Sequence, residues 1–200
     1  MVHKSGSDQF PQFRPHVSNL VISLIKPDKE LFNKGLLSES KGLGIGAFTY
    51  YRRVVYNQWR RLLDKIKEAA KKQEEPDSVI LRIEEAEKEE QFGKAVDIVK
   101  DIIPETLRIR SHNPISLLYG ETSVAIHELT DEECLKIADS IRFILSKLAD
   151  NIYKVNKDAE DTKAHLTRLF SKKKKSEKDQ QANGTDDTKT GNQAPKNNNN

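Results

Sequence analysis

The sequence predicts an all-α fold, a bundle of about five to six helices with a long C-terminal helix and a disordered tail. Apolar residues recur along most of positions 28–170 at the spacing that places them on one face of an α-helix. Charged residues make up 32% of the chain and hydrophobic residues only 36%, a balance typical of long amphipathic helices. Glycine and proline interrupt the periodic segments, at 42–46, Pro76 and Pro104.

The N-terminal elements are the least regular. Residues 1–18 show no periodicity, so we expect a flexible arm ahead of a helical domain at 19–170. The apolar run at 19–25 predicts one short extended segment, either an edge strand or an extended packing segment. Pro27 ends it, and Asp28 is a candidate N-cap for a first helix over about 28–41.

The clearest helix spans about 45–73, because its apolar side chains fall on one broad face. After Pro76, Asp77 is a candidate cap for a pair of helical stretches that Pro104 closes. Asn113 then precedes a proline at the first helical position, which predicts a helix over about 114–127.

The last helix begins at a capping box, Thr130 to Glu133, in which side chains and main-chain amides satisfy one another. A single apolar stripe then runs from Cys134 to Phe170, about 60 Å of helix at about 1.5 Å per residue. Because this exceeds the width of a small domain, either the helix breaks near 151–161 or its end pairs with another chain. We therefore expect a homodimer or another protein partner.

The positive charge belongs to the C-terminal tail. Of the net charge of +3, residues 171–200 contribute seven lysines against four acids, which leaves 27 basic and 27 acidic residues in positions 1–170. A basic folded surface, the usual footprint of a nucleic-acid binder, is therefore not expected. The tail lacks the apolar content needed to fold. Its lysine run predicts salt-sensitive affinity for nucleic acid or an acidic surface, with a solubilising tail as the alternative: Lys172, Lys173, Lys174 and Lys175.

Several classes of protein are not expected. The single cysteine, Cys134, has no disulfide partner, and the chain lacks both a secretory signal pattern and an apolar run long enough to cross a bilayer. We therefore expect a cytoplasmic protein. The histidines and the cysteine show neither zinc-ligand spacing nor a nucleophile arrangement, so we expect no metal and no cofactor.

Two features of the long helix at 45–73 are candidate binding elements. Gly42, Gly44 and Gly46 precede it, where free amides can hold a phosphate, but the spacing fits no phosphate-binding loop and favours a tight turn or a close approach of two helices. Arg52 lies within the apolar face, so we expect an acid, a helix C-terminus or a bound anion opposite it. Neighbouring Arg53 is a candidate for binding or for a solvated surface.

The irregular segment before position 114 holds the other candidates. Arg108 and Arg110 are candidate binding residues, as is Asn113, which also has the capping role. His112 and His127 are candidate catalytic residues, with Arg110 placed to stabilise a developing phosphate charge. A helix separates the two histidines, so we expect them to meet only across a dimer interface or through a break in that helix.

Three segments carry a resemblance: KGLGIGAFTYYRRVV at 41–55, NPISLL at 113–118 and HELTDEEC at 127–134. They are similar to a prokaryotic and phage family of helical domains of unknown function, loosely related to the HEPN superfamily. The resemblance implies an all-helical bundle, often dimeric, in some cases encoded near restriction or defence systems. Active HEPN ribonucleases carry an arginine, four to six residues and a histidine that act across a dimer. Here Arg108 and His112 have only three residues between them.

Two hypotheses follow. The first is a non-enzymatic helical interaction domain, homodimeric and acting through partner or nucleic-acid contacts in a bacterial or phage setting. The second is a metal-independent ribonuclease that uses His112 or His127 with Arg110 or Arg52. The missing arginine-to-histidine spacing favours the first.

Overall fold

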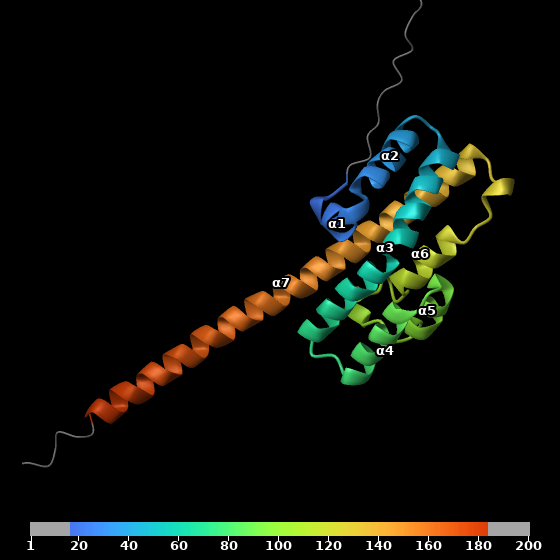
Figure 1. Cartoon of the computed structure of the whole chain (residues 1–200). Coiled ribbons are helices and arrows are strands. Elements are labelled where there is room, and N and C mark those ends of the chain that lie inside the picture. The colour runs from blue at the N-terminus through green and yellow to red at the C-terminus, as the bar shows by residue number, and fades with distance from the viewer. Residues whose placement is uncertain (1–16, 184–200) are drawn as a thin grey trace, which may run out of the picture. The chain divides into compact units, whose positions relative to one another are not determined.

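The computed structural model describes residues 17–183, with side chains to residue 171, and confirms the all-α class (Figure 1). It divides into two units, Met1–Asp158, here called the body, and Ala159–Asn200. The helices of the described chain are α1 Asn19–Leu24, α2 Lys29–Ser40, α3 Gly44–Lys72, α4 Asp77–Lys88, α5 Phe92–Val99, α6 Pro114–Thr122 and α7 Asp131–Asn183. Short 3-10 turns lie at Lys26–Asp28, Glu105–Leu107 and Ile126–Glu128.

The N-terminal segment corrects one prediction. Residues 19–24 form helix α1 and not an extended segment. A six-residue apolar run fits a buried strand and a buried helix equally well. Ser18 favours the helix, because its side chain accepts a hydrogen bond from the amide of Val21 and so caps the first turn. Residues 1–16 of the predicted arm lie outside the described residues.

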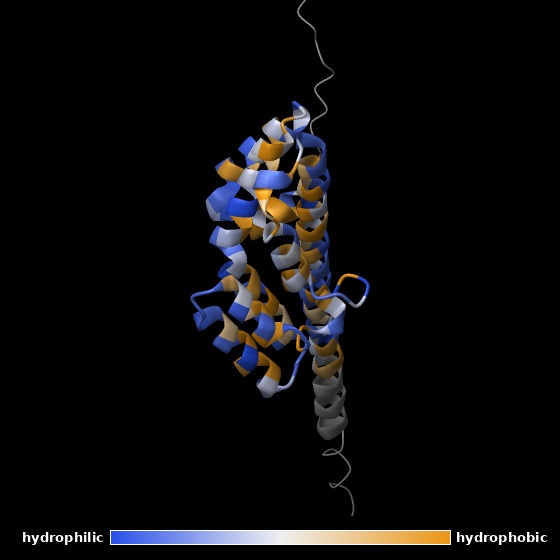
Figure 2. Cartoon of the chain, turned by 90° about the vertical axis from the view of Figure 1, so that its right-hand side faces the viewer, coloured by the Kyte–Doolittle hydropathy of each residue, from blue (hydrophilic) through white to orange (hydrophobic). Residues whose placement is uncertain are grey.

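Helix α3 is the centre of the body, and its predicted apolar face is buried. It contacts α1, α2, α4 and α6, and side chains from Phe48 to Ala70 on that face are almost fully buried. Hydrophobic and hydrophilic residues alternate along the helices of the body (Figure 2). The predicted spans of α2 and α3 agree with the structure to within one residue at each end. Helix α6 begins at Pro114 as predicted but ends five residues early, at Thr122.

Two predicted caps do not form. Asp28 stands at the N-cap of α2, but its carboxylate accepts hydrogen bonds from Asn57 and Gln58 on α3. Asp77 is the first residue of α4, whose N-cap is Pro76. The capping box does form, since the Thr130 amide donates to Glu133 Oε2 at 2.9 Å and the Glu133 amide to Thr130 Oγ1 at 3.3 Å.

A partly buried polar network joins α2, α3 and α7. Tyr51 is fully buried, and its hydroxyl donates to Glu39 Oε2 at 2.7 Å. Arg142 of α7 donates to the other oxygen of Glu39 at 3.0 Å and also bonds Asp139. Gly35 of α2 is required here, because a Cβ atom at that position would lie 2.4 Å from the Tyr51 ring.

Helix α7 is continuous from Asp131 to Asn183, with no break at 151–161 (Figure 1). Its backbone therefore continues past the predicted domain end at 170. The side chains of 172–183, which include the lysine run, and all of 184–200 lie outside the described residues. None of the helices in the described part of the chain combines the length and the hydrophobicity needed to cross a bilayer.

Candidate functional site

The glycine motif before α3 is a structural turn. Gly42 adopts a positive φ of 72°, which glycine tolerates without steric cost. A Cβ atom on Gly44 would lie 1.8 Å from the carbonyl oxygen of Asp131, so this glycine permits the N-terminal ends of α3 and α7 to touch. The Asp131 carboxylate accepts a hydrogen bond from the amide of Ile45 at 2.8 Å. The carboxylate of Asp131 thus occupies the N-terminal end of α3, where a bound phosphate would have to lie.

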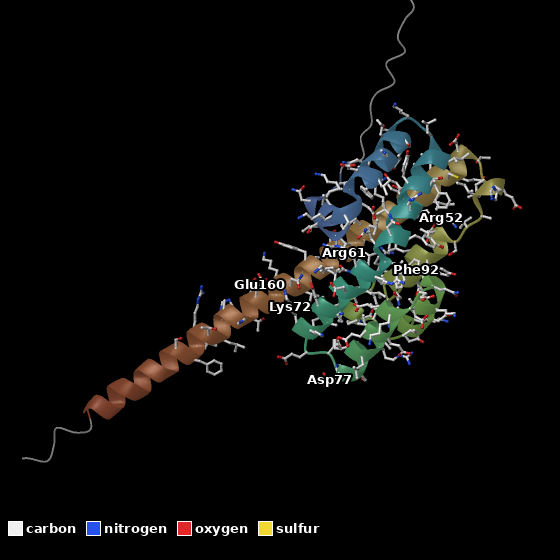
Figure 3. The ribbon with its side chains drawn as sticks, in the orientation of Figure 1. Arg52, Arg61, Lys72, Asp77, Phe92 and Glu160 are labelled. Carbon is white, nitrogen blue, oxygen red and sulfur yellow. The ribbon has the colours of Figure 1, made fainter. Side chains whose placement is uncertain are left out.

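Arg52 is half-buried on α3, and its partner is a main-chain carbonyl. Its guanidinium donates to the carbonyl of Val124, just beyond the C-terminus of α6, at 3.1 Å. Arg52 is labelled in Figure 3. It also lies 6.0 Å from the ring centre of Phe48 and 5.6 Å from that of Tyr56. Of the three partners expected for Arg52, this carbonyl comes nearest to the helix C-terminus, although it lies two residues past the last residue of α6. The side chain of Arg52 is therefore held in place by contacts within the body.

Four further arginines also donate to main-chain carbonyls, an arrangement that could not be predicted from the sequence. Helix ends leave carbonyl groups without intrahelical partners, and arginine donors can satisfy them. Arg60 donates to the carbonyls of Glu87 and Glu89 at the end of α4, and Arg61 to those of Ser23 and Leu24 at the end of α1. Arg82 donates to Ile98 near the end of α5.

Arg108, the last of these four, and Asn113 hold the irregular segment together. Arg108 donates to the carbonyls of Asp101 and Ile103, each at 2.8 Å. Asn113 is buried; its side-chain oxygen accepts from the amide of Ile115 at 2.8 Å, and its amide donates to Val99 at 2.8 Å. Two predicted binding residues are thus occupied by internal hydrogen bonds.

The exposed candidates gather on one two-residue turn. Arg110 and Ser111 have positive φ values of 46° and 66°, although neither is glycine. Ile109 and His112 close the turn through main-chain hydrogen bonds of 2.9 and 3.0 Å. Nδ1 of His112 lies 2.7 Å from the carbonyl of Arg110. Because a carbonyl only accepts, Nδ1 carries a proton, and Nε2 of the neutral ring is left as an acceptor.

The remaining candidates are not brought together. His127 is exposed in the 3-10 turn Ile126–Glu128, and the nine residues of α6, about 13 Å of helix, separate it from His112 within one chain. Arg53 is exposed on α3 and makes no hydrogen bond or ion pair within the described residues. No group of three or more His, Cys, Asp or Glu side chains within residues 17–171 is arranged to hold a metal ion.

The distal unit presents a different kind of surface. Buried residues of α7 follow a heptad pattern, at alternating intervals of four and three, from Cys134 through Leu145, Leu148 and Ile152 to Val155. In the sequence the same pattern continues through four positions, here called the distal stripe: Ala159, Thr162, Leu166 and Leu169. Leu166 and Leu169 are 46% and 62% exposed, and the adjacent Phe170 is 67% exposed.

Comparison with protein-family models, with curated proteins and with solved structures finds no match to this chain.

Proposed function

We propose that the protein is a non-enzymatic helical interaction protein that forms a homodimer through the distal stripe of α7. The observation that carries this proposal is the exposure of Leu166 and Leu169 in a heptad pattern that is buried elsewhere in the same helix, with Phe170 exposed beside them. Heptad repeats of apolar residues pack against a second helix by inserting each side chain between four residues of the partner.

A second copy of the chain is the partner that the stripe fits. The stripe comprises four layers and therefore about two heptads, too short for a free peptide to form a stable helix in water. Here the helix is already formed, because its N-terminal part from Cys134 to Val155 is buried in the body. A second copy presents an identical preformed helix, so pairing requires no further ordering of backbone.

The structure of the body also supports a non-enzymatic role. Arg52, Arg108 and Asn113 are occupied by hydrogen bonds within the chain. The exposed pair, Arg110 and His112, lies on a single turn with no carboxylate hydrogen-bonded to the imidazole in the described structure. A general base is ordinarily oriented by such a third group.

The experiment compares the full chain with the double variant Leu166→Glu, Leu169→Glu by sedimentation velocity over a range of concentrations. We expect the wild type to show concentration-dependent dimerisation, and the variant to remain monomeric because four carboxylates would meet in one small apolar interface. Both side chains are exposed, so the melting temperature of the body should not change.

The matched control adds the same two charges away from the stripe, as Ala164→Glu, Thr167→Glu. Both positions are exposed and lie on the opposite side of the heptad pattern. The control should dimerise as the wild type does. A monomeric wild type at all accessible concentrations, or equal dimerisation by the stripe variant, would refute the proposal.

The ribonuclease hypothesis has one observation in its favour: Nε2 of His112 makes no hydrogen bond within the described residues, and the exposed Arg110 lies two positions before it on the same turn. It is tested by incubating the purified protein with total RNA in EDTA. Under the proposed function, wild type, His112→Ala and His127→Ala leave the RNA equally intact. Cleavage that disappears in one histidine variant would replace the interaction hypothesis with the enzymatic one.

A further inference from the structure

We infer that the two copies pair with their α7 helices antiparallel, so that Ala159 of one chain packs against the partner's Leu169 and Thr162 against the partner's Leu166. This inference rests on the proposed function and specifies its geometry. A two-fold axis then passes between the two central layers, and each chain contributes the same four residues, as a closed symmetric dimer requires.

The first reason is that a parallel partner has no room. In a parallel, in-register pair, the residues of each α7 would face their own equivalents along the whole heptad pattern. The N-terminal part of that pattern is already covered by the body, since Ile141, Leu145 and Leu148 are fully buried and Val155 is 7% exposed. A parallel partner would therefore have to diverge at the start of the stripe. In an antiparallel pair, the partner approaches this region only with the helical residues that follow its Leu169, up to Asn183, and these alone would have to diverge from the body.

The second reason is the size of the side chains in the stripe. The first two positions, Ala159 and Thr162, are small, and the last two, Leu166 and Leu169, are large. Parallel pairing would place small against small in two layers and large against large in the other two. Antiparallel pairing places one small and one large side chain in every layer, which fills the interface evenly without voids.

Charge favours parallel pairing, but by a smaller free energy than the one by which packing favours antiparallel pairing. Lys163 flanks the stripe, and antiparallel pairing brings it near the partner's Lys163, whereas parallel pairing would place it beside the partner's Asp158. Charge pairs on exposed helix surfaces contribute only about 0.3–0.5 kcal/mol. Exposing or under-packing a buried leucine costs about 2–5 kcal/mol. Packing therefore decides the orientation.

Cysteine cross-linking tests the orientation directly. One preparation carries Ala159→Cys and a second, with an added size tag, carries Leu169→Cys; each is first shown by sedimentation to dimerise. The native Cys134 is fully buried, and the wild type serves as the control for it. The two preparations are oxidised separately and after mixing. Disulfides need Cα atoms about 4.4–6.8 Å apart, whereas antiparallel pairing holds two copies of residue 159 about 15 Å apart along the helix.

We expect a disulfide-linked species only in the mixture, at the combined size of one tagged and one untagged chain, and at least tenfold above either separate preparation. A linked dimer of Ala159→Cys alone would show parallel pairing, and would overturn this inference while leaving the proposed homodimer intact. Dimers by sedimentation with no linked species in the mixture would overturn it too. A chain that sediments as a monomer would overturn both proposals.

Discussion

Replacing Gly44 with alanine is the most direct test of the contact between α3 and α7. The added Cβ would lie 1.8 Å from the carbonyl oxygen of Asp131, against 3.4 Å or more in ordinary contact. The ends of the two helices must therefore separate by about 1.6 Å, the difference between these distances. That movement breaks the 2.8 Å hydrogen bond between the Ile45 amide and the Asp131 carboxylate.

The expected cost follows from three contributions. Overpacking of this kind costs about 1–3 kcal/mol, and the loss of a helix cap about 1 kcal/mol. Alanine recovers up to about 1 kcal/mol of helix propensity relative to glycine. We therefore expect Gly44→Ala to reduce the free energy of unfolding by about 1–3 kcal/mol. With a urea m-value of about 2 kcal/mol/M, the midpoint should fall by roughly 0.5–1.5 M.

Gly46→Ala is the matched control, assayed in parallel by far-UV circular dichroism in urea. Its added Cβ would lie 3.2 Å from Ser38 Oγ, a contact that a small side-chain rotation relieves. The same gain in helix propensity then leaves its stability within about 1 kcal/mol of the wild type. If both variants unfolded at the same urea concentration, the contact between Gly44 and Asp131 would not have the energetic role assigned to it.

Two further changes test the polar contacts of the body. Asn113→Ala should lower the free energy of unfolding by about 1–3 kcal/mol, because it removes a cap and leaves the carbonyl of Val99 with only the 3.4 Å hydrogen bond from the Ile102 amide. Asn113→Ser, whose hydroxyl can keep the cap but loses the amide donor, should lie between the wild type and Asn113→Ala in the same urea assay. Equal midpoints for the two variants would contradict this. Burial, and then the hydrogen bond to Glu39, raise the pKa of Tyr51 above its ordinary value of 10.0. The folded state therefore favours the protonated phenol, whose stabilising contribution is intact below pH 10 and is lost as the pH rises further. Above pH 10, the free energy of unfolding should fall with pH more steeply in the wild type than in Tyr51→Phe. The difference between the two slopes should correspond to about one proton released on unfolding. Identical slopes would count against a buried phenol.

Some local features, two helix starts and one apolar helix face, could be predicted from the sequence. The capping box at Thr130 and the Asn113-Pro114 helix start both formed as expected, since each depends on atoms within three residues. The broad apolar face of α3 was also predicted, because helical periodicity survives any arrangement of neighbouring helices. One wrong prediction, an extended segment at 19–25, concerned a run too short for its period to be measured.

Features that depend on distant residues were not predictable from one sequence. Asp28 has the chemistry of a cap, yet it pairs with Asn57 and Gln58 about 30 positions away. The partner of the Ile45 amide lies 86 positions along the chain. Arg52 was correctly placed on the apolar face, but its carbonyl partner belongs to the segment after α6. Periodicity identifies the face of a helix and not the group that meets it.

The arginines at the helix ends also determine which substitutions the fold tolerates. Arg60, Arg61 and Arg108 each span two carbonyl groups with one planar guanidinium. Lysine would keep the positive charge, but a single ammonium cannot reproduce that fork. A protein that conserves this body is therefore constrained to arginine at these positions and not merely to a basic residue. Its positive charges act as parts of the backbone hydrogen-bonding scheme, so the isoelectric point of such a chain says little about what its surface binds.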